Sequence, residues 1–554
     1  MRIKFLANGP IGTLGIKPHY RIYINPAYFM LKHYHTLHGN REYNHKWLLP
    51  DFIANRTAEE IVGTGRHSKN SLISDQVNLL LLPCFVWNMD LQMEVAKLYK
   101  ERVPRGWVVV GGPQLTAHKD PKFFEKYPFI DYAVYGDGEK ALSNIIDYIA
   151  TGERSAWVNT VENVNGKARV WPFEVLRDEK YWSTSPYLTQ KQFIRDNLEA
   201  MYTETGLSNL HVMFALEFAR GCMYKCAYCD WSQNLTKKVT RRIADWKLEL
   251  EFFRDLDVQI RETDANFGQW KQDVEIYEYA TKLFDQKRNF KFLVWNTAKL
   301  DKNKDRFFVP QVLTYNSSIT FSFEDTEKGP LEAMNRPSLS WTEQQAVLSR
   351  VRDRIGEMRF QQFVKAELML GSPKQSIATF KENFKKLLGE GISNVILNQW
   401  VLAPNSPGAD LNYQKKYGVK WKDHLVHNTK NNKYVPKSVE DAYNWADNNP
   451  NFVKQKTVYS TDDMEYVDII TVLIAGRVLS SKIIKHQVRK VYAEAIQNHD
   501  MPDMSKVVDW LFEFSQNKAT EVFKLHEDCI KKYGFVLPYY VSNDKFNSDW
   551  ATFE

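Results

Sequence analysis

The chain has 554 residues, of which 44% are hydrophobic and 25% are charged, and its formal net charge is +7. These values predict a globular protein of about two to four domains, and a charge this modest favours an anionic ligand over nucleic acid. No apolar run reaches the roughly 18 residues that span a bilayer, and the first residues do not resemble a secretory signal. We therefore expect a cytoplasmic protein with neither a membrane nor a nucleic-acid partner.

Apolar runs alternate with a helical pattern in the first third, residues 1–165. Buried strands are predicted over 78–84, 107–110 and 132–135, and a helix is predicted over 91–99. The alternation indicates a doubly wound α/β domain, in which ligands bind beyond the carboxyl ends of the strands.

Glycine-rich loops follow the second and third of these strands. They read Gly111-Gly112-Pro113-Gln114 and Gly136-Asp137-Gly138-Glu139. Glycine allows the backbone to approach a ligand closely, although a plain turn is the more common meaning of each glycine pair taken alone. Beyond them, Asn165-Gly166 predicts a tight hairpin, and residues 166–207 are interpreted as a linker.

The next segment holds three of the five cysteines within eight residues, at Cys222, Cys226 and Cys229. Soft thiolate ligands suit an iron–sulfur cluster, and three of them leave one iron open for chemistry. A structural zinc site is the alternative, but zinc normally takes four ligands. The remaining cysteines, Cys84 and Cys529, lie far away in sequence.

Residues 208–408 again alternate strands and helices. Six strands are predicted, over 211–218, 258–262, 292–295, 318–323, 363–370 and 394–402. Polar residues follow these strands, where a barrel collects its chemistry, but each could instead cap a helix. Glu367, inside the fifth strand, either faces the barrel interior or pairs with Lys365 or Arg359.

The last segment, residues 409–554, is predicted to be mainly helical. Helical periodicity extends over 462–497 and 505–532, whereas the polar stretch 410–450 predicts loops with short helices.

The spacing C-x3-C-x2-C, with Tyr228 before the third cysteine, resembles the signature of the radical S-adenosylmethionine (SAM) enzymes. The two glycine loops upstream, together with Trp87-Asn88, resemble the cobalamin-binding domain of one class of these enzymes. The resemblance covers about residues 70–410 and implies a Rossmann-like domain over 1–165, a partial (β/α)6 barrel over 208–408 and a helical extension. The chain contains no Asp-x-His sequence, so the resemblance implies cobalamin without a protein histidine ligand.

The resemblance also implies three cofactors and their contacts. Cys222, Cys226 and Cys229 would hold a 4Fe-4S cluster, and SAM would chelate its open iron. The implied SAM contacts are Tyr228, Asp264, Asn266, Asn296 and Glu324, while Tyr228 and Glu367 are the candidate catalytic residues. The implied cobalamin contacts are Trp87, Asn88, Gly111, Gly112, Pro113, Gln114, Gly136, Gly138 and Glu139.

By this resemblance the chain is a methyltransferase that uses a 5′-deoxyadenosyl radical and methylcobalamin to methylate an unactivated carbon. Two alternatives stay open: a cobalamin-dependent cyclase or rearrangement enzyme, and a radical SAM enzyme without cobalamin. A non-catalytic iron–sulfur protein is disfavoured by the polar strand ends. The expected partners are a small-molecule or peptide substrate and an electron donor such as flavodoxin or ferredoxin.

Overall fold

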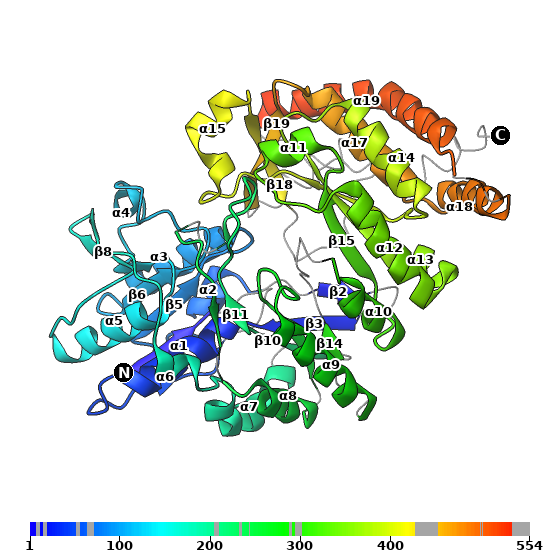
Figure 1. Ribbon diagram of the computed structural model, residues 1–554. Helices are drawn as coiled ribbons and strands as arrows, with labels where there is room; N and C mark the ends of the chain where they lie inside the picture. The colour runs from blue at the N-terminus through cyan, green and yellow to red at the C-terminus, as the bar shows by residue number, and fades with distance from the viewer. Residues whose placement is uncertain are drawn as a thin grey trace. The chain divides into compact units, whose positions relative to one another are not determined.

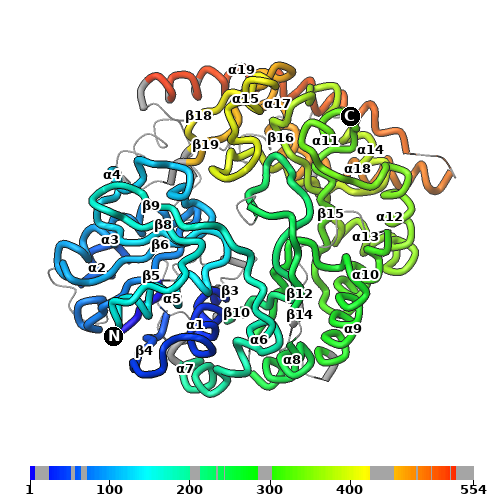
Figure 2. The backbone as a smooth tube through the Cα atoms, turned by 60° about the vertical axis from the view of Figure 1, so that its left-hand side comes forward, coloured from blue at the N-terminus to red at the C-terminus, as the bar shows by residue number. Residues whose placement is uncertain are grey.

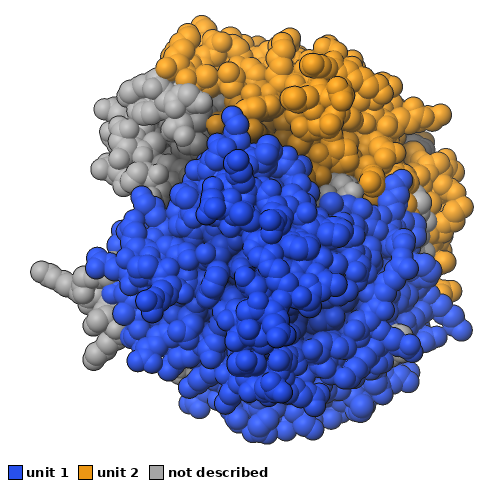
Figure 3. Space-filling view, turned by 90° about the vertical axis from the view of Figure 1, so that its left-hand side faces the viewer, with its two compact units in different colours: residues 1–223, 230–296 blue, residues 224–229, 297–554 orange. Residues whose placement is uncertain are grey.

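The computed structural model describes residues 1–6, 12–14, 19–50, 56–63, 71–203, 210–231, 235–242, 244–256, 258–286, 291–293, 302–426, 453–498, 500 and 502–533. The chain divides into two compact units, which are coloured separately in Figure 3. Unit 1 comprises residues 1–223 and 230–296, and unit 2 comprises residues 224–229 and 297–554. Each unit is described by itself.

The first sheet of unit 1 has seven strands in the order β4-β1-β5-β6-β7-β8-β9 (Figure 1). The strands are β1 Arg2–Phe5, β4 Lys46–Trp47, β5 Leu79–Pro83, β6 Trp107–Gly111, β7 Tyr132–Val134, β8 Thr160–Val164 and β9 Lys167–Val170. Pairing is parallel from β4 to β7 and antiparallel from β7 to β9. All five residues of β5 are buried, as a continuous apolar run predicts for a central parallel strand.

The hairpin between β8 and β9 turns at the predicted residues. Asn165 and Gly166 both have positive φ, at 52° and 84°. Two adjacent residues in this region form the turn whose twist matches that of the flanking strands. The segment interpreted as a linker therefore begins with a strand of the seven-stranded sheet.

Helices of unit 1 alternate with these strands. They are α1 Pro26–His38, α2 Ala58–Val62, α3 Met89–Arg102, α4 Phe123–Lys126, α5 Glu139–Thr151, α6 Glu179–Trp182, α7 Lys191–Thr203, α8 Trp246–Arg254 and α9 Lys271–Gln286. Helix α5 begins directly after the second glycine loop, and it packs beside α1.

A second sheet of unit 1 has the order β14-β13-β10-β3-β2. Its strands are β2 Gly12–Leu14, β3 His19–Ile24, β10 Leu210–Leu216, β13 Gln259–Glu262 and β14 Lys291–Leu293. Figure 2 shows β3 beside β10, and the two strands pair in parallel. This sheet therefore combines a strand from the first 25 residues with strands from beyond residue 208, which the sequence does not indicate.

Unit 2 contains the parallel sheet β15-β16-β17 and the helices that follow its strands. The strands are β15 Ile319–Glu324, β16 Val364–Leu370 and β17 Val395–Gln399. The helices are α10 Asp305–Leu313, α11 Lys328–Ala333, α12 Trp341–Ile355, α13 Glu357–Phe363 and α14 Ile377–Gly389. A bulge between Ser322 and Glu324 interrupts the pairing of β15 with β16 at the carboxyl end of β15.

The described residues from 409 onward are mainly helical, and they include one antiparallel pair of strands that was not predicted. Its helices are α15 Leu411–Lys416, α17 Tyr466–Leu479, α18 Lys482–Gln497 and α19 Ser505–Tyr533. Strand β18 Lys420–Val426 pairs antiparallel with β19 Val453–Ser460. The prediction of loops and short helices over 410–450 was wrong at β18, because its polar side chains mask the alternating strand pattern.

The predicted α/β class is confirmed as a mixed fold with parallel sheets and many helices. Within the described ranges, every helix is too short or too polar to cross a membrane.

Candidate functional site

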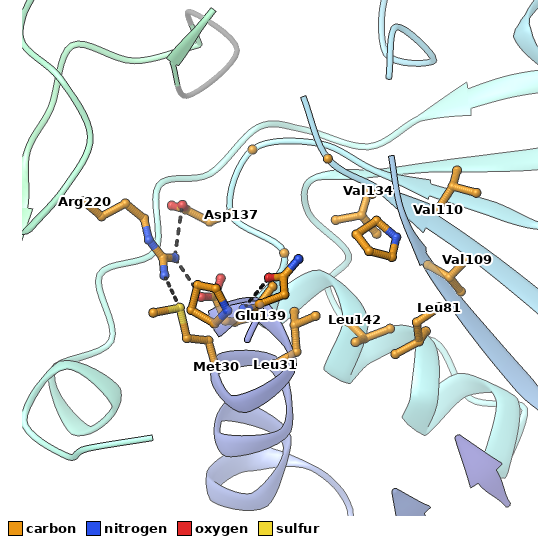
Figure 4. A pocket seen from close by; sticks show the side chains of 18 of the residues that line it. Met30, Leu31, Leu81, Val109, Val110, Val134, Asp137, Glu139, Leu142 and Arg220 are labelled. Atoms are coloured by element: carbon orange, nitrogen blue, oxygen red, sulfur yellow. Dashed lines mark hydrogen bonds and ion pairs between the residues drawn. The ribbon is translucent and has the colours of Figure 1, made fainter. Parts of the chain in front are cut away.

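A cavity of about 340 Å³ opens at the carboxyl ends of β5, β6 and β7 in unit 1. Four glycines of the two predicted loops line it, at positions 111, 112, 136 and 138, together with Glu139. Its floor is apolar and includes Leu81, Val109, Val134 and Leu142 (Figure 4). The predicted loops thus converge on one concave, mostly apolar site, which is the usual form of a small-molecule pocket.

Two of these glycines are required by close packing. Gly112 has a φ of 109°, and a Cβ atom there would lie 2.6 Å from the carbonyl oxygen of Cys84. Gly136 has a φ of 65°, and a Cβ atom there would meet the Phe173 ring at 2.7 Å. Gly111 differs, because a Cβ atom there would meet its nearest neighbour at 3.9 Å, an ordinary van der Waals contact, so this position on the cavity lining can accept a side chain.

Arg220 borders the cavity and forms ion pairs with three carboxylates. Its guanidinium lies 2.7 Å from Glu139 and 3.4 Å from Asp137 in the second glycine loop, and 2.8 Å from Glu217. Tyr181 donates a hydrogen bond to the same Glu139 carboxylate over 3.0 Å. The arginine is two residues before Cys222, so these contacts join the glycine loop to the start of the cysteine segment.

Burial and neighbouring charges shift the pKa values of these residues in opposite directions. Burial lowers the pKa of Arg220, but the adjacent Glu139 and Glu217 outweigh it and hold that pKa well above its usual range. Burial raises the pKa of Asp137, while Arg220 counteracts it. The Arg220 guanidinium compensates the charges of the carboxylates around it. Removing the arginine would leave these partly buried carboxylates without a counter-charge, which destabilises the folded state.

The remaining predicted cobalamin contacts stand beside the cavity and do not line it. Asn88 accepts a hydrogen bond from Phe85 N at 2.7 Å and donates one to the Pro83 carbonyl at 3.0 Å. Trp87 is 42% exposed and stacks on Phe85, which does line the cavity. Pro113 and Gln114 follow Gly112 and are also absent from the lining.

The first motif cysteine lies beside a predicted SAM contact in unit 1. Asn266 Nδ2 donates to Cys222 Sγ at 3.2 Å, and Asn266 Oδ1 is buried with no hydrogen-bond partner among the described residues. Asp264 is also buried, but its carboxylate accepts from Phe218 N at 2.7 Å. Burial raises the pKa of Asp264 well above its usual range, and the backbone donors Ala219 and Phe218 counteract this. Asp264 therefore fixes the backbone between β10 and the cysteines.

The other predicted residues form a buried polar network in unit 2. Tyr228 Oη donates to Glu324 Oε1 at 3.1 Å, and Arg336 Nη2 lies 3.5 Å from the same oxygen. Arg336 also donates to the Ser322 carbonyl and interacts with Cys226. Burial, followed by the charge of Glu324, raises the pKa of Tyr228 well above its usual range.

Glu324 occupies an unusual backbone conformation at the carboxyl end of β15. Its φ is 64°, in the left-handed region that side chains other than glycine rarely adopt. Strain of this kind, about 1–3 kcal/mol, gathers at functional sites, where the surrounding structure maintains it.

Glu367 belongs to the same network and pairs with neither Lys365 nor Arg359. Ser322 Oγ donates to Glu367 Oε2 at 2.9 Å, and burial raises the pKa of the Glu367 carboxyl. Asn296 lies outside the described residues. Arg336 was missed by sequence reasoning, because Asn335-Arg336-Pro337 indicates only the turn that ends α11.

No family model matches the chain, but two curated proteins do. It is 30% identical over 360 residues to the cobalamin-dependent radical SAM methyltransferase TokK of Streptomyces tokunonensis, covering 62% of this chain and 50% of that protein. It is 30% identical over 345 residues to 2-(S-pantetheinyl)-carbapenam-3-carboxylate methyltransferase of Streptantibioticus cattleyicolor, covering 60% and 48%. The chain thus spans about half the length of the curated relatives it matches.

Two solved structures share the fold. The cobalamin-dependent SAM radical enzyme OxsB aligns with a TM-score of 0.59 at 12% identity, over 99% of this chain and 83% of that one. The radical SAM methyltransferase TsrM of Kitasatospora setae, solved with tryptophan substrate and a SAM analogue, aligns with a TM-score of 0.51 at 12% identity, over 74% of each chain. With the curated relatives, these findings confirm the predicted resemblance of this chain to the cobalamin-dependent radical SAM enzymes.

Proposed function

We propose that this chain is a cobalamin-dependent radical SAM methyltransferase that transfers a methyl group to an unactivated carbon of a small molecule. The observation that carries the proposal is the cavity at the ends of β5, β6 and β7, because both predicted glycine loops line it. The second of these loops is joined through Arg220 to the segment that holds Cys222. One structural unit therefore links the two sequence motifs that a two-cofactor enzyme needs.

The proposal includes a finer division of the fold. We propose a Rossmann-like cobalamin domain built on the seven-stranded sheet, and a partial barrel with β10, β13, β14, β15, β16 and β17 as its strands. These strands occur in the two units as consecutive parallel series. We propose the helices α17, α18 and α19 as the extension that follows.

The cavity fits cobalamin in three respects. Its apolar floor suits the face of a corrin ring, and its glycine rim lets backbone N–H groups approach the amide side arms of the ring. No histidine is found among the described residues that line it, as expected for cobalamin bound without a protein histidine ligand. Cobalamin would supply the methyl group, and these residues would bind and orient the ring.

The cysteine segment fits an iron–sulfur cluster with SAM beside it. Cys222, Cys226 and Cys229 would supply three thiolates, and a reduced cluster would supply the electron that cleaves SAM. Asn266 hydrogen-bonds the first cysteine and presents a buried, unpartnered amide oxygen that suits an ammonium group. Arg336 lies beside Cys226 and suits a carboxylate. The ammonium and the carboxylate of SAM thus each have a candidate partner next to a motif cysteine.

We assign the unit 2 network to the rest of SAM and to the substrate. Glu324 would accept hydrogen bonds from the ribose hydroxyls, and the Tyr228 ring would contact the adenine. Glu367 is half-buried beside them and would orient the substrate or hold one of its protons. The small-molecule substrates of the relatives support a small molecule here. A flavodoxin or ferredoxin as electron donor, and the cytoplasm as location, remain part of the proposal.

The test is an anaerobic purification followed by reconstitution with iron and sulfide in the presence of hydroxocobalamin. We expect about four irons and one corrinoid per chain, and reductive cleavage of added SAM to 5′-deoxyadenosine. Four irons and SAM cleavage without corrinoid would refute the cobalamin assignment and retain radical SAM chemistry. Iron without SAM cleavage would refute the enzymatic proposal.

A further inference from the structure

A cluster of two histidines and one aspartate lies in unit 1, outside the proposed cofactor sites. His35 is in the last turn of α1, His45 immediately precedes β4, and Asp147 is in α5. One ligand atom from each residue lies within 4.8 Å of the other two. Two imidazoles and a carboxylate form a donor set typical of first-row divalent metals.

One ring nitrogen of the first histidine is engaged in a hydrogen bond with a neighbouring helix. His35 is 7% exposed, and its Nδ1 forms a 3.0 Å hydrogen bond with Ser143 Oγ on α5. A Cβ atom at position 39 would lie 2.4 Å from the His35 ring, so only glycine allows the chain to pass the ring there. With Nδ1 engaged, Nε2 is the nitrogen left to bind a metal, as in metal sites where a second group orients the histidine.

The ring of the second histidine makes no hydrogen bond to the described residues. Both ring nitrogens of His45 are buried, and neither has a hydrogen-bond partner among the described residues. A buried nitrogen without a partner destabilises the folded state, and a metal–nitrogen bond would remove that penalty.

The aspartate completes the set without losing its present contact. One carboxylate oxygen of Asp147 accepts a hydrogen bond from Asn40 N at 3.0 Å, which leaves the second oxygen for a cation. Ligand atoms around a tetrahedral zinc lie about 3.3 Å apart, given bonds of about 2.0–2.1 Å. The three atoms would therefore approach one another by up to about 1.5 Å, and His45, which lies outside a helix, can supply most of that movement.

We propose that His35, His45 and Asp147 bind a divalent zinc ion, with water in the fourth position. The ion would join α1, α5 and the segment before β4. The amino-terminal ends of both helices line the cavity, through Ala27, Met30 and Leu31 on α1 and Glu139 and Leu142 on α5. Metal binding would thus hold together two of the helices that shape the proposed cobalamin pocket.

The test uses the 554-residue chain with Cys222, Cys226 and Cys229 replaced by alanine, beside the unmodified chain. This choice prevents zinc binding at the thiols and makes the result independent of the proposed function. After equilibration with zinc chloride and removal of excess metal, we expect one zinc per chain by elemental analysis. Cobalt(II) should give visible bands of tetrahedral geometry without a sulfur-to-cobalt charge-transfer band.

His45→Ala and Asp147→Asn should each lower zinc affinity at least about tenfold, because even the loss of a residue that only orients a ligand costs about 10–100-fold. His45→Ala should keep the fold, because His45 makes no hydrogen bond that its removal would break. His486→Ala, at an exposed histidine of α18, is the matched control and should bind zinc normally. Absence of zinc from the chain with the three cysteine-to-alanine substitutions, or equal zinc binding by the His45 and His486 variants, would overturn the proposal.

Discussion

The cavity of unit 1 is lined mainly by apolar side chains, whereas the polar network of unit 2 consists of ionisable side chains. The cavity is formed by aliphatic side chains and bare glycine backbone, with its charges gathered at the Arg220 edge. The network is formed by ionisable side chains that are buried against one another, with Glu324 between Tyr228 and Arg336. Recognition in the cavity therefore depends on shape, whereas recognition at the network depends on charge. A substitution that changes side-chain volume should therefore affect the cavity most, and one that changes charge should affect the network most.

The largest effect is expected from filling the cavity. Gly111→Val adds a side chain at a position with 3.9 Å of clearance and no positive φ, so the fold should tolerate it. Because the added atoms occupy the space above the floor, corrinoid affinity should fall at least about a hundredfold, roughly 2.7 kcal/mol. Spectrophotometric titration with hydroxocobalamin measures this.

Gly329→Val is the control for that variant, since it adds the same atoms in α11 beside a flexible lysine. Both variants should retain the iron content of the parent. If Gly111→Val bound corrinoid normally, the cavity would not be the cobalamin site. Recognition by shape in unit 1 could then not be contrasted with recognition by charge in unit 2.

A smaller effect on cofactor binding, with a larger effect on stability, is expected from removing one charge in the network. Glu324→Gln keeps the shape but leaves the buried Arg336 without its carboxylate, which should cost about 3–5 kcal/mol of unfolding free energy. SAM affinity of the reconstituted protein should fall about tenfold, with corrinoid affinity unchanged. Urea unfolding and equilibrium dialysis measure the two quantities.

The control here is Glu327→Gln, three residues along the same loop. Glu327 pairs with Lys386 at the surface, where an ion pair contributes at most about 1 kcal/mol. Equal losses of stability in the two variants would show that Glu324 behaves as an ordinary surface charge.

The sequence predicted the cavity better than the network, and the reason is physical. Each glycine pair follows directly after a predicted buried strand, and in a doubly wound sheet that position is the ligand-binding edge. The loops at Gly111 and Gly136 could therefore be placed at the sheet edge before the fold was known. Arg336 could not be assigned, because nothing local distinguishes an arginine that folds back to Glu324 from one that faces solvent. Similarly, strand β3 pairs with β10 across almost 200 residues, and no local pattern specifies so distant a partner.

Trp87 and Asn88 show a different limit. The sequence placed both at the end of β5, where they lie, but not the direction of their side chains. Asn88 satisfies backbone groups of its own loop, and Trp87 stacks on the residue that lines the cavity. Position along a strand was predictable, whereas side-chain role depends on bonds that form only after folding.

A pH-dependent effect should distinguish Glu367 from the surface carboxylates. Burial raises its pKa in the folded state, so folding stabilises the protonated form. The free energy of unfolding should therefore decline as the pH rises from about 4.5, the unfolded value, through the folded pKa. Glu367→Gln removes this decline, so the stability of the variant relative to the parent should increase over that range and then level off.

Urea unfolding of parent and variant at several pH values between about 4 and 8 measures that difference. Glu382→Gln is the control, since Glu382 pairs with Lys385 on an exposed face of α14. If the difference in unfolding free energy between the parent and Glu367→Gln stayed constant with pH, Glu367 would not have a raised pKa and would not belong to the buried polar network of unit 2.

The smallest effect is expected from a single hydroxyl. Tyr228→Phe removes the 3.1 Å hydrogen bond to Glu324 and keeps the ring, so unfolding free energy should fall by about 1 kcal/mol. Tyr413→Phe loses a comparable bond, 2.8 Å to the Ala333 carbonyl, and should cost a similar amount. Only the Tyr228 variant should also weaken SAM binding, by about fivefold or 1 kcal/mol, because Glu324 is then less firmly oriented. If both variants bound SAM as the parent does, the hydroxyl would serve stability alone, and Glu324 would be held in place by its arginine partner and its backbone.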